Sequence, residues 1–406
     1  MYLTHISLTN IRNFARLDVQ VPPGVVVLLG ANGQGKTSLL EAIYYLATFT
    51  SFHAQHDREL VNFLAAREQI AVGRILARFA RENPSGHGSA NHVIEIRLIQ
   101  ESNGYNGPAR LRREVLVDGI RRKLSEALGE FLAVLFLPHM VQIILGAPEE
   151  RRRFLNLALA QIVPGYNRDL ADYSGALSQR NALLKQLAEN GGDPSQLDYW
   201  DDLLANKGAA LIQDRIRAIQ ELEILAARFH RELTRGESVL RLLYQPAYDP
   251  LPQPPGQYPL PLDSPADRSG LTLAQIQEGF AHALHRQRQD DISRGVTNLG
   301  PHRDELRFIE NGIDLGTFGS RGQIRTALLS LKIAEVAWIK ARSGFSPVLL
   351  LDEALAELDP QRRKDLLDQL ADEQQILLTT TDLALFSQEF VQNATLWHIT
   401  AGRLEN

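Results

Sequence analysis

The chain has 406 residues, of which 44% are hydrophobic, and its 43 basic and 48 acidic side chains give a net charge of -5. This length suffices for two domains, or for one domain with a large insertion, and the negative charge excludes a global positive field for binding nucleic acid. The absence of cysteine excludes disulfides, thiol nucleophiles and cysteine-ligated zinc.

The start of the chain does not have the pattern of a targeting segment. The first residues, MYLTHISLTN, contain no basic segment followed by an apolar one, and no apolar run in the sequence approaches the roughly 18 residues of a membrane span. We therefore expect a cytoplasmic protein without a membrane partner.

Two strands are expected within residues 2–29. Ile6 and Leu8 belong to the alternating pattern of the first strand, and Val25–Leu29 form the second. A Pro-Pro-Gly turn at 22–24 separates them. Apolar residues with helical spacing between Leu39 and Leu46 then predict a helix.

The segment between the second strand and this helix has the sequence of a phosphate-binding loop. GANGQGKTS, residues 30–38, matches G-x-x-x-x-G-K-[ST] without a mismatch, in the strand-loop-helix context that the pattern requires. Lys36 would place a positive charge on the β- and γ-phosphates, and Thr37 would offer a hydroxyl to Mg²⁺. We predict that ATP and Mg²⁺ bind here, at the helix N-terminus. The predicted contacts are Gly30, Ala31, Asn32, Gly33, Gln34, Gly35, Lys36, Thr37 and Ser38.

The IRNF segment, residues 11–14, lies upstream of this loop. Two interpretations of Arg12 remain open: a charge solvated in a loop, or a cation that reaches the nucleotide. Arg12 and the adjacent Asn13 are therefore further candidates for nucleotide binding.

A strand-rich region follows the first helix. Alternating apolar residues predict strands at 70–79 and 92–99, and Asp118-Gly119 predicts the turn of a hairpin. Basic residues cluster around this hairpin, at Arg110, Arg112, Arg113, Arg121, Arg122 and Lys123. They either face the phosphate backbone of DNA or protect an exposed sheet edge against aggregation.

From Pro148 to Leu233 the pattern becomes helical. Two antiparallel helices joined near Gly191-Gly192 would form an arm of roughly 60 Å, at 1.5 Å per residue. Arg151–Arg153, at the base of this arm, fit a solvated helix face. The proline-rich stretch 245–265 cannot continue a helix or a strand ladder, and we interpret it as a linker.

Two segments of the last third have the features of sites. The opening GSRGQ, residues 319–323, precedes a long helix whose unpaired N–H groups would face an anion. The apolar strand Val348–Leu351 then ends in Asp352-Glu353, which is the Walker B arrangement. Asp352 would orient the Mg²⁺ shell together with Thr37, and Glu353 would be the general base for the attacking water. The same pair also suits the start of a helix.

The order of these motifs resembles the ATP-binding-cassette heads of the SMC, Rad50 and RecF group, and the match is closest to the RecF family. It covers nearly the whole chain. The segments specific to RecF are RRRFL at 151–155, QRNALLK at 179–185 and GPHRDEL at 300–306. The resemblance implies an α/β ATPase head with an inserted helical arm. It divides the chain into a lobe half at 1–137, the arm and linker at 138–270 and the second lobe half at 271–406.

The resemblance also implies roles for residues that the patterns alone leave open. Ser320, Gly322 and Gln323 would form a signature motif that meets the nucleotide of a second protomer. Glu357, Leu358 and Asp359 would belong to the D-loop, Thr381 would take the γ-phosphate role of a missing histidine, and Gln142 would stand in a Q-loop. Asp352-Glu353 departs from the two aspartates that RecF proteins often carry.

The resemblance further implies an ATP-dependent homodimer that binds double-stranded DNA and its junctions with single strands. RecR would be the direct partner, RecO and RecA would be indirect ones, and the protein would help to load RecA onto strands coated by SSB. Two other classes share the ATP chemistry: a transporter cassette, which usually has the missing histidine, and a nucleotide-gated clamp with slow hydrolysis. An SMC-type structural protein would need a much longer arm.

Overall fold

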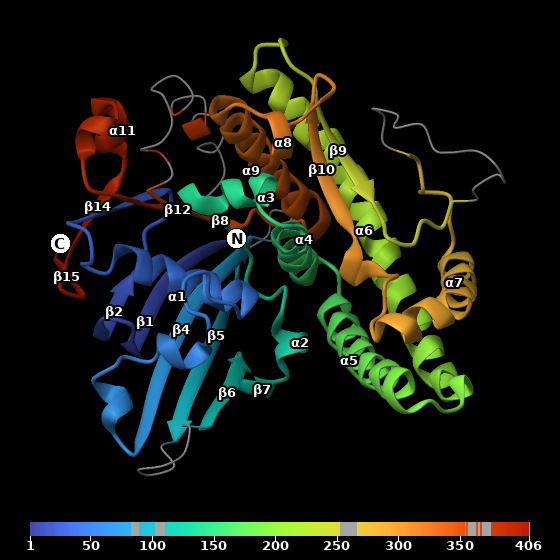
Figure 1. The fold of residues 1–406 in the computed structure, drawn as a ribbon. Coiled ribbons are helices and arrows are strands. Elements are labelled where there is room, and N and C mark those ends of the chain that lie inside the picture. The colour runs from blue at the N-terminus through green and yellow to red at the C-terminus, as the bar shows by residue number, and fades with distance from the viewer. Residues whose placement is uncertain are drawn as a thin grey trace. The chain divides into compact units, whose positions relative to one another are not determined.

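The computed structural model describes residues 1–82, 89–101, 110–251, 266–353, 355, 363, 366–367 and 375–405 (Figure 1). It divides into two compact units, the first comprising Met1–His139 and Ile339–Asn406 and the second comprising Met140–Trp338. The structure therefore groups residues 271–338 with the helical insertion, whereas the sequence placed them in the second ATPase half. The reason is packing, because α7 (Leu273–Arg294) contacts α5 (Tyr166–Asn190) and α6 (Asp198–Leu233).

An antiparallel sheet and a mainly parallel sheet form the described part of the first unit, each with six strands. The antiparallel order β2-β1-β4-β5-β6-β7 has the bounds Phe14–Gln20, Tyr2–Ile11, Ile70–Glu82, Ser89–Glu101, Arg110–Val117 and Ile120–Arg122. The second order, β15-β14-β3-β13-β12-β8, has the bounds Arg403–Glu405, Thr395–Thr400, Val25–Leu29, Ile376–Thr380, Val348–Asp352 and Ala133–Phe136, and only β15 is antiparallel to its neighbour.

The central strands of the parallel sheet are nearly continuous apolar runs. VLLLD in β12 and ILLTT in β13 are buried at every position, as expected for strands covered on both faces. Since neighbouring parallel strands end at the same edge, the carboxyl ends of β3, β12 and β13 come together. That edge carries the loop after β3 and the two acidic residues after the apolar run of β12.

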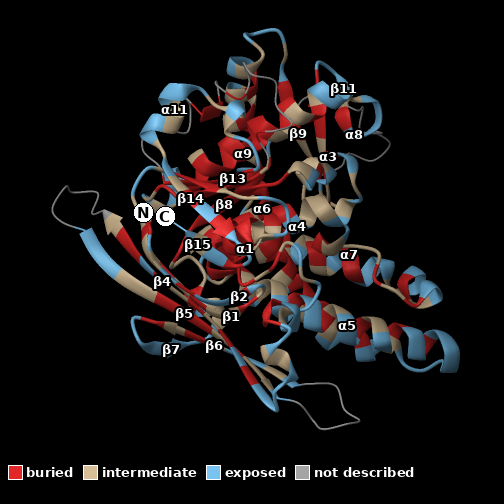
Figure 2. Cartoon of the chain, turned by 90° about the vertical axis from the view of Figure 1, so that its left-hand side faces the viewer, coloured by how far each residue is buried: buried red, intermediate tan, exposed pale blue. Residues whose placement is uncertain are grey.

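Helix α1 (Lys36–Thr48) connects the two sheets of the first unit. It contacts β4 and β5 of the antiparallel sheet and β8, β12 and β13 of the parallel one, so most of its residues are buried (Figure 2). This explains its apolar side chains on all sides, since a helix packed on both faces has no solvent face to keep polar. The shorter helices of this unit are η1 (Asp57–Leu60), η2 (Ala65–Arg67), α2 (Leu124–Ala127), η7 (Leu383–Leu385) and α11 (Gln388–Asn393).

The second unit combines helices with a small antiparallel sheet of order β11-β10-β9. These strands are Ile313–Asp314, Glu305–Glu310 and Leu240–Gln245, and β9 packs against α6. The other helices are η4 (Pro138–Val141, across the boundary), α3 (Gln142–Leu145), α4 (Pro148–Ile162), η5 (Pro194–Leu197), η6 (Pro301–Arg303), α8 (Leu315–Phe318) and α9 (Arg321–Ser343, ending in the first unit).

The predicted helical arm is present and corresponds to α5 and α6, which pack against each other across the connection that contains Gly191-Gly192. Helix α6 has 36 residues and so spans about 54 Å at 1.5 Å per residue. The two-helix expectation omitted α7, which packs against both helices. None of the helices in the described residues is long and apolar enough to cross a membrane.

Candidate functional site

The loop after β3 brings uncapped backbone N–H groups to one point. Helix α1 begins at Lys36, and its N-cap residue, Gly35, supplies no side-chain cap. The first turn contains no acidic residue that would compete with a bound anion. Because the first N–H groups of a helix lack partners within the helix and carry its positive dipole end, this terminus suits phosphate.

Asn13, between strands β1 and β2 of the antiparallel sheet, contacts the loop. Its Nδ2 donates to the carbonyl oxygen of Gln34 at 2.8 Å. A Cβ on Gly35, where φ is +120°, would lie 2.6 Å from that Nδ2, so this close approach requires glycine. Asn13 therefore lies against the loop, as a support for its backbone, and its direct contact with a nucleotide stays a prediction.

Lys36 is nearly fully buried at the start of α1. Its Nζ donates to the carbonyl oxygens of Gly30 at 2.6 Å and Ala31 at 3.1 Å, and lies 3.9 Å from Oε1 of Glu353. Burial lowers the pKa of Lys36, while the charges of Glu353 and Asp352 oppose that shift. The ammonium group thus sits at the loop with carboxylates close by.

Thr37, Asp352 and Glu353 come together although the last two are distant from the loop in sequence. Thr37 Oγ1 donates to both carboxylate oxygens of Asp352, at 2.9 Å each. Asp352 is buried at the end of β12, whereas the side chain of Glu353 is 43% exposed and can be reached by water. Glu353 adopts a left-handed backbone with φ of +51°, which is uncommon for a residue other than glycine.

The other loop residues are more accessible to solvent than Lys36. Ala31, Asn32 and Gly33 are exposed, and Ser38 is half-buried in the first turn of α1. The side-chain oxygen of Gln34 accepts from the backbone N–H of Ala401 at 2.6 Å, which ties the loop to the turn between β14 and β15.

Arg12 is not a freely solvated charge. Its Nε and Nη2 donate to the two carboxylate oxygens of Glu41 at 2.6 and 2.8 Å, and its Nη1 donates to the carbonyl oxygen of Glu59 at 3.0 Å. Burial favours a raised pKa for Glu41, but the hydrogen bonds from Arg12 and Ser51 outweigh it and hold the pKa below its usual value. The apolar spacing that predicts α1 gives no indication of Glu41 as the partner of Arg12.

The predicted signature residues lie at the N-terminus of α9 in the second unit. The backbone N–H of Ser320 donates to Oε1 of Gln323 at 2.9 Å, and the N–H of Gln323 donates to Oγ of Ser320 at 3.3 Å. This reciprocal pair is a capping box. Ser320 and Gly322 are exposed, so the N-terminus of this long helix is accessible.

The remaining predictions concern Gln142, Thr381 and the D-loop. Gln142 is exposed at the start of α3, and Thr381 is exposed directly after β13. The proposed D-loop residues Glu357, Leu358 and Asp359 lie outside the described residues.

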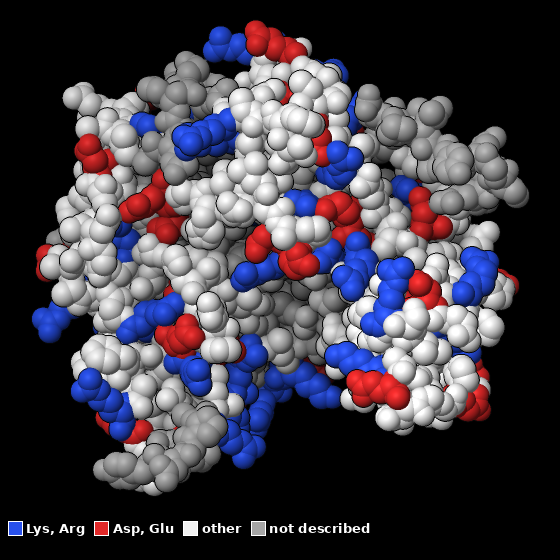
Figure 3. Space-filling model, in the orientation of Figure 1, with Lys and Arg blue, Asp and Glu red and all other residues white. Residues whose placement is uncertain are grey.

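The arginines of the basic hairpin β6–β7 lie on two opposite faces of the antiparallel sheet. Arg112 and Arg121 are 52% and 66% exposed on the solvent face, where both flank Glu114. Arg113 points the other way: its Nη1 donates to Tyr45 Oη at 3.2 Å and to the Phe49 carbonyl oxygen at 3.0 Å. Arg110, Arg122 and Lys123 are exposed as well, and Lys and Arg side chains gather over this hairpin (Figure 3).

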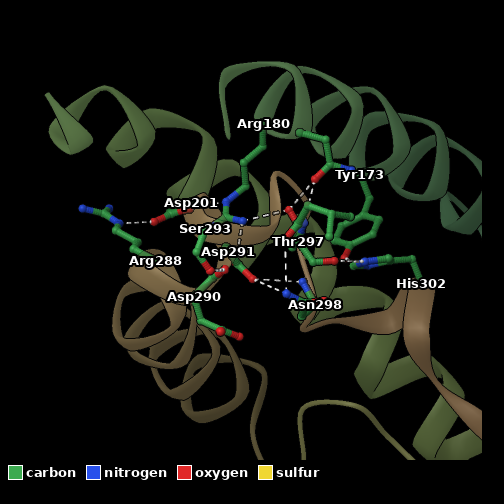
Figure 4. Close-up of polar contacts among 12 residues, drawn as sticks. Tyr173, Arg180, Asp201, Arg288, Asp290, Asp291, Ser293, Thr297, Asn298 and His302 are labelled. Carbon is green, nitrogen blue, oxygen red and sulfur yellow. Dashed lines mark hydrogen bonds and ion pairs between the residues drawn. The ribbon is translucent and has the colours of Figure 1, made fainter. Parts of the chain in front are cut away.

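Buried polar contacts involve two of the three segments of the second unit that were singled out as RecF-specific, QRNALLK and GPHRDEL. Arg180 is fully buried, and its guanidinium donates to Asp201 Oδ1 at 2.6 Å, Asp291 Oδ2 at 2.8 Å and Thr297 Oγ1 at 2.8 Å (Figure 4). Burial lowers the pKa of His302 to about 4. The neutral ring then accepts from Tyr173 Oη at 2.7 Å through Nδ1 and donates to the Thr297 carbonyl oxygen at 3.1 Å. These groups hold α5, α6 and α7 together.

Comparisons with known proteins match the whole chain. Residues 2–400 match the model of the RecF/RecN/SMC N-terminal domain family. The chain is 39% identical over 411 aligned positions to proteins from Chloroflexus aggregans and Chloroflexus aurantiacus that are both called DNA replication and repair protein RecF, and each alignment covers 100% of this chain and 99% of the relative. A solved structure described as the recombination mediator protein RecF-ATP in the RecFOR pathway has a TM-score of 0.81 and 29% identity, and the match covers 100% of this chain and 97% of that one.

Proposed function

This chain belongs to the RecF family, and we propose that it is an ATP-dependent DNA-binding protein of recombinational repair, acting at gaps and stalled replication as a homodimer that slowly hydrolyses ATP. The observation that carries the proposal is the uncapped N-terminus of α1 with Lys36, Thr37, Asp352 and Glu353 around it. A cation for the phosphates, oxygen ligands for a metal and an accessible carboxylate for the water are the parts that phosphoryl transfer requires.

The contact between Thr37 and Asp352 fits Mg²⁺, because a hydroxyl and a carboxylate from two different elements converge within hydrogen-bond distance and Mg²⁺ prefers oxygen ligands. When bound, the ion would neutralise charge on the β- and γ-phosphates. Lys36 adds a second positive charge beside the loop, and Glu353 accepts the proton of the attacking water. These roles combine binding and hydrolysis in the first unit.

The second half of each site comes from the partner protomer in this proposal. Ser320, Gly322 and Gln323 would meet the γ-phosphate of the other protomer through the N-terminus of α9, and Asp359 would stand at the same interface. The exposure of Ser320 and Gly322 supports an intermolecular role, since their helix terminus is open to a ligand.

Mixing two inactive variants tests this shared site. Lys36→Met removes the phosphate cation, and Ser320→Arg places a bulky charge at the helix terminus. In a two-fold dimer both lesions fall in one site of a mixed dimer, so the other site is intact. With random exchange and independent sites, an equal mixture should recover roughly a quarter of the wild-type ATPase rate.

The matched control mixes Lys36→Met with Glu353→Gln. Both residues lie in the first unit and would serve the same site, so each site of that mixed dimer retains one lesion and hydrolysis should not recover. Recovery in the control but not in the first mixture would contradict the assignment of Ser320 to the partner's site.

For DNA we propose the solvent face of the β6–β7 hairpin, with Arg112 and Arg121 as phosphate contacts and Arg122 and Lys123 beside them. The exposure of Arg112 and Arg121, and the orientation of Arg113 toward Tyr45 and Phe49 instead of the solvent face, support this choice. A local basic surface is required because the net charge of the chain is -5.

Replacing Arg112 and Arg121 together by Gln should weaken duplex binding on the order of 10-fold and lower the slope of log affinity against log salt by about 2, one for each lost phosphate contact. Fluorescence anisotropy with ATP over a salt series measures both. The matched control is Arg228→Gln with Arg294→Gln, which removes two exposed arginines from α6 and α7. Equal losses in the two double variants would show an effect of total charge and refute the hairpin surface.

RecR is the direct partner in this proposal, with RecO and RecA acting indirectly while RecA is loaded onto strands coated by SSB. The support is that a similar solved protein is described as a recombination mediator of the RecFOR pathway. Co-sedimentation with RecR, with and without ATP and DNA, tests the direct contact.

A further inference from the structure

The hydroxyl of Thr379 lies between the two acidic residues of the site. Thr379 is buried in β13, directly opposite Asp352 in the register of the parallel strands. Its Oγ1 donates to Oδ1 of Asp352 at 2.7 Å and accepts from the backbone N–H of Glu353 at 2.9 Å. The Thr379 hydroxyl thereby contacts both Asp352, which is proposed to hold Mg²⁺, and Glu353, which is proposed as the general base.

The first of these bonds orients the carboxylate of Asp352. Thr37 donates to both carboxylate oxygens, whereas Thr379 donates to Oδ1. The bond from Thr379 therefore anchors Oδ1 toward β13 and, together with Thr37, which lies equally close to both oxygens, fixes the rotation of the group. A carboxylate that is held by a second hydrogen bond is already oriented when a metal arrives.

The second bond supports the backbone of Glu353. The left-handed φ of +51° at this residue is unfavourable for a side chain with a Cβ and persists only where neighbouring groups stabilise it. The hydrogen bond from its N–H to Thr379 supplies such support. The direction of the Glu353 side chain, whose Oε1 lies 3.9 Å from Lys36 Nζ, follows from this backbone turn.

We propose that Thr379 is a positioning residue that orients Asp352 for Mg²⁺ and Glu353 for the water at the same time. The inference rests on the proposed ATPase function and adds to it a residue that acts through Asp352 and Glu353. It also distinguishes Thr379 from the next two threonines of the TTTD run. Thr380 forms hydrogen bonds with Asp382 in its own turn, and Thr381 is exposed.

The test compares Thr379→Val, which keeps the side-chain shape and loses both bonds, with Thr379→Ser, which keeps the hydroxyl. Binding of a non-hydrolysable ATP analogue over a Mg²⁺ series is measured first, and steady-state ATP turnover second. In Thr379→Val, we expect the Mg²⁺ concentration that gives half of the increase in affinity for the ATP analogue to rise about 10-fold. We expect ATP turnover to fall by roughly 10- to 100-fold, as for other residues that orient metal ligands. Binding without Mg²⁺ should stay unchanged, and Ser should restore both readouts.

The matched control is Thr380→Val, one position further along β13, whose hydroxyl does not contact Asp352 or Glu353 among the bonds of the described residues. It should retain the Mg²⁺ dependence of wild type. A Thr379→Val protein with wild-type Mg²⁺ dependence and turnover would overturn the assignment, as would a Ser variant as impaired as Val. Wild-type protein that binds ATP with no Mg²⁺ effect and no turnover would instead overturn the proposed function.

Discussion

Glu353→Gln is expected to lower ATP turnover on the order of 100-fold or more while changing nucleotide affinity by less than about 3-fold, because Gln holds the water but cannot take its proton. The structure supports this separation of effects. The Glu353 side chain is 43% exposed, and its contact with Lys36 is long, at 3.9 Å. Asp352 and Thr37, which would hold the metal, keep their own hydrogen bonds in the variant.

Phosphate release with and without DNA measures the turnover, and a fluorescent ATP analogue measures the affinity. With hydrolysis blocked, dimers on DNA should accumulate in size-exclusion chromatography. Glu389→Gln in α11 is the matched control, since it removes an exposed carboxylate of the same unit without touching the site. Normal turnover in Glu353→Gln would place the general base elsewhere.

Lys36→Met is expected to weaken ATP binding by up to about 100-fold, because a hydrogen bond to a charged group contributes up to about 3 kcal/mol and every 1.4 kcal/mol is a factor of ten. Met fills the space of the lysine stem in this buried position, so the fold should persist. Burial lowers the pKa of Lys36 because it removes water from the charged ammonium group. Replacing this group by Met therefore also removes an unfavourable buried charge.

Thermal unfolding with and without ATP and Mg²⁺ measures this effect directly, since a ligand that binds the folded state raises its melting temperature. Wild type should gain stability with ATP, whereas Lys36→Met should not. Lys185→Met, an exposed position of α5, is the control for charge and should respond as wild type does. An unchanged response of Lys36→Met to ATP would refute the phosphate-loop assignment.

The fold class followed from the sequence because its main signals are contiguous. A strand, a glycine-rich loop and a helix at 25–46 specify a phosphate loop by local backbone requirements alone, and the apolar run before Asp352 predicted a buried strand. Both are present as β3, α1 and β12. The helical insertion was equally visible, because helical spacing persists over the long helices α5 and α6.

The boundary between the two units depends on packing between segments that are far apart in the sequence. Residues 273–294 form α7, a helix that the sequence analysis did not predict within the segment it placed in the second ATPase half. Only the contacts of α7 with α5 and α6 assign it to the second unit.

The partners of charged and hydroxyl side chains were decided by tertiary structure. Arg12 pairs with Glu41 of α1, and Arg113 turns away from Arg112 toward Tyr45, because strand alternation gives opposite faces and only the packing shows which face α1 covers. Thr379 could not be distinguished from its neighbours in TTTD until the register of β12 and β13 placed it opposite Asp352. Sequence alone thus predicted the strand, loop and helix at 25–46, the strand before Asp352 and the two long helices α5 and α6, since these depend on adjacent residues. Which side chains meet depended on strand register and helix packing, since these join residues that the sequence keeps apart.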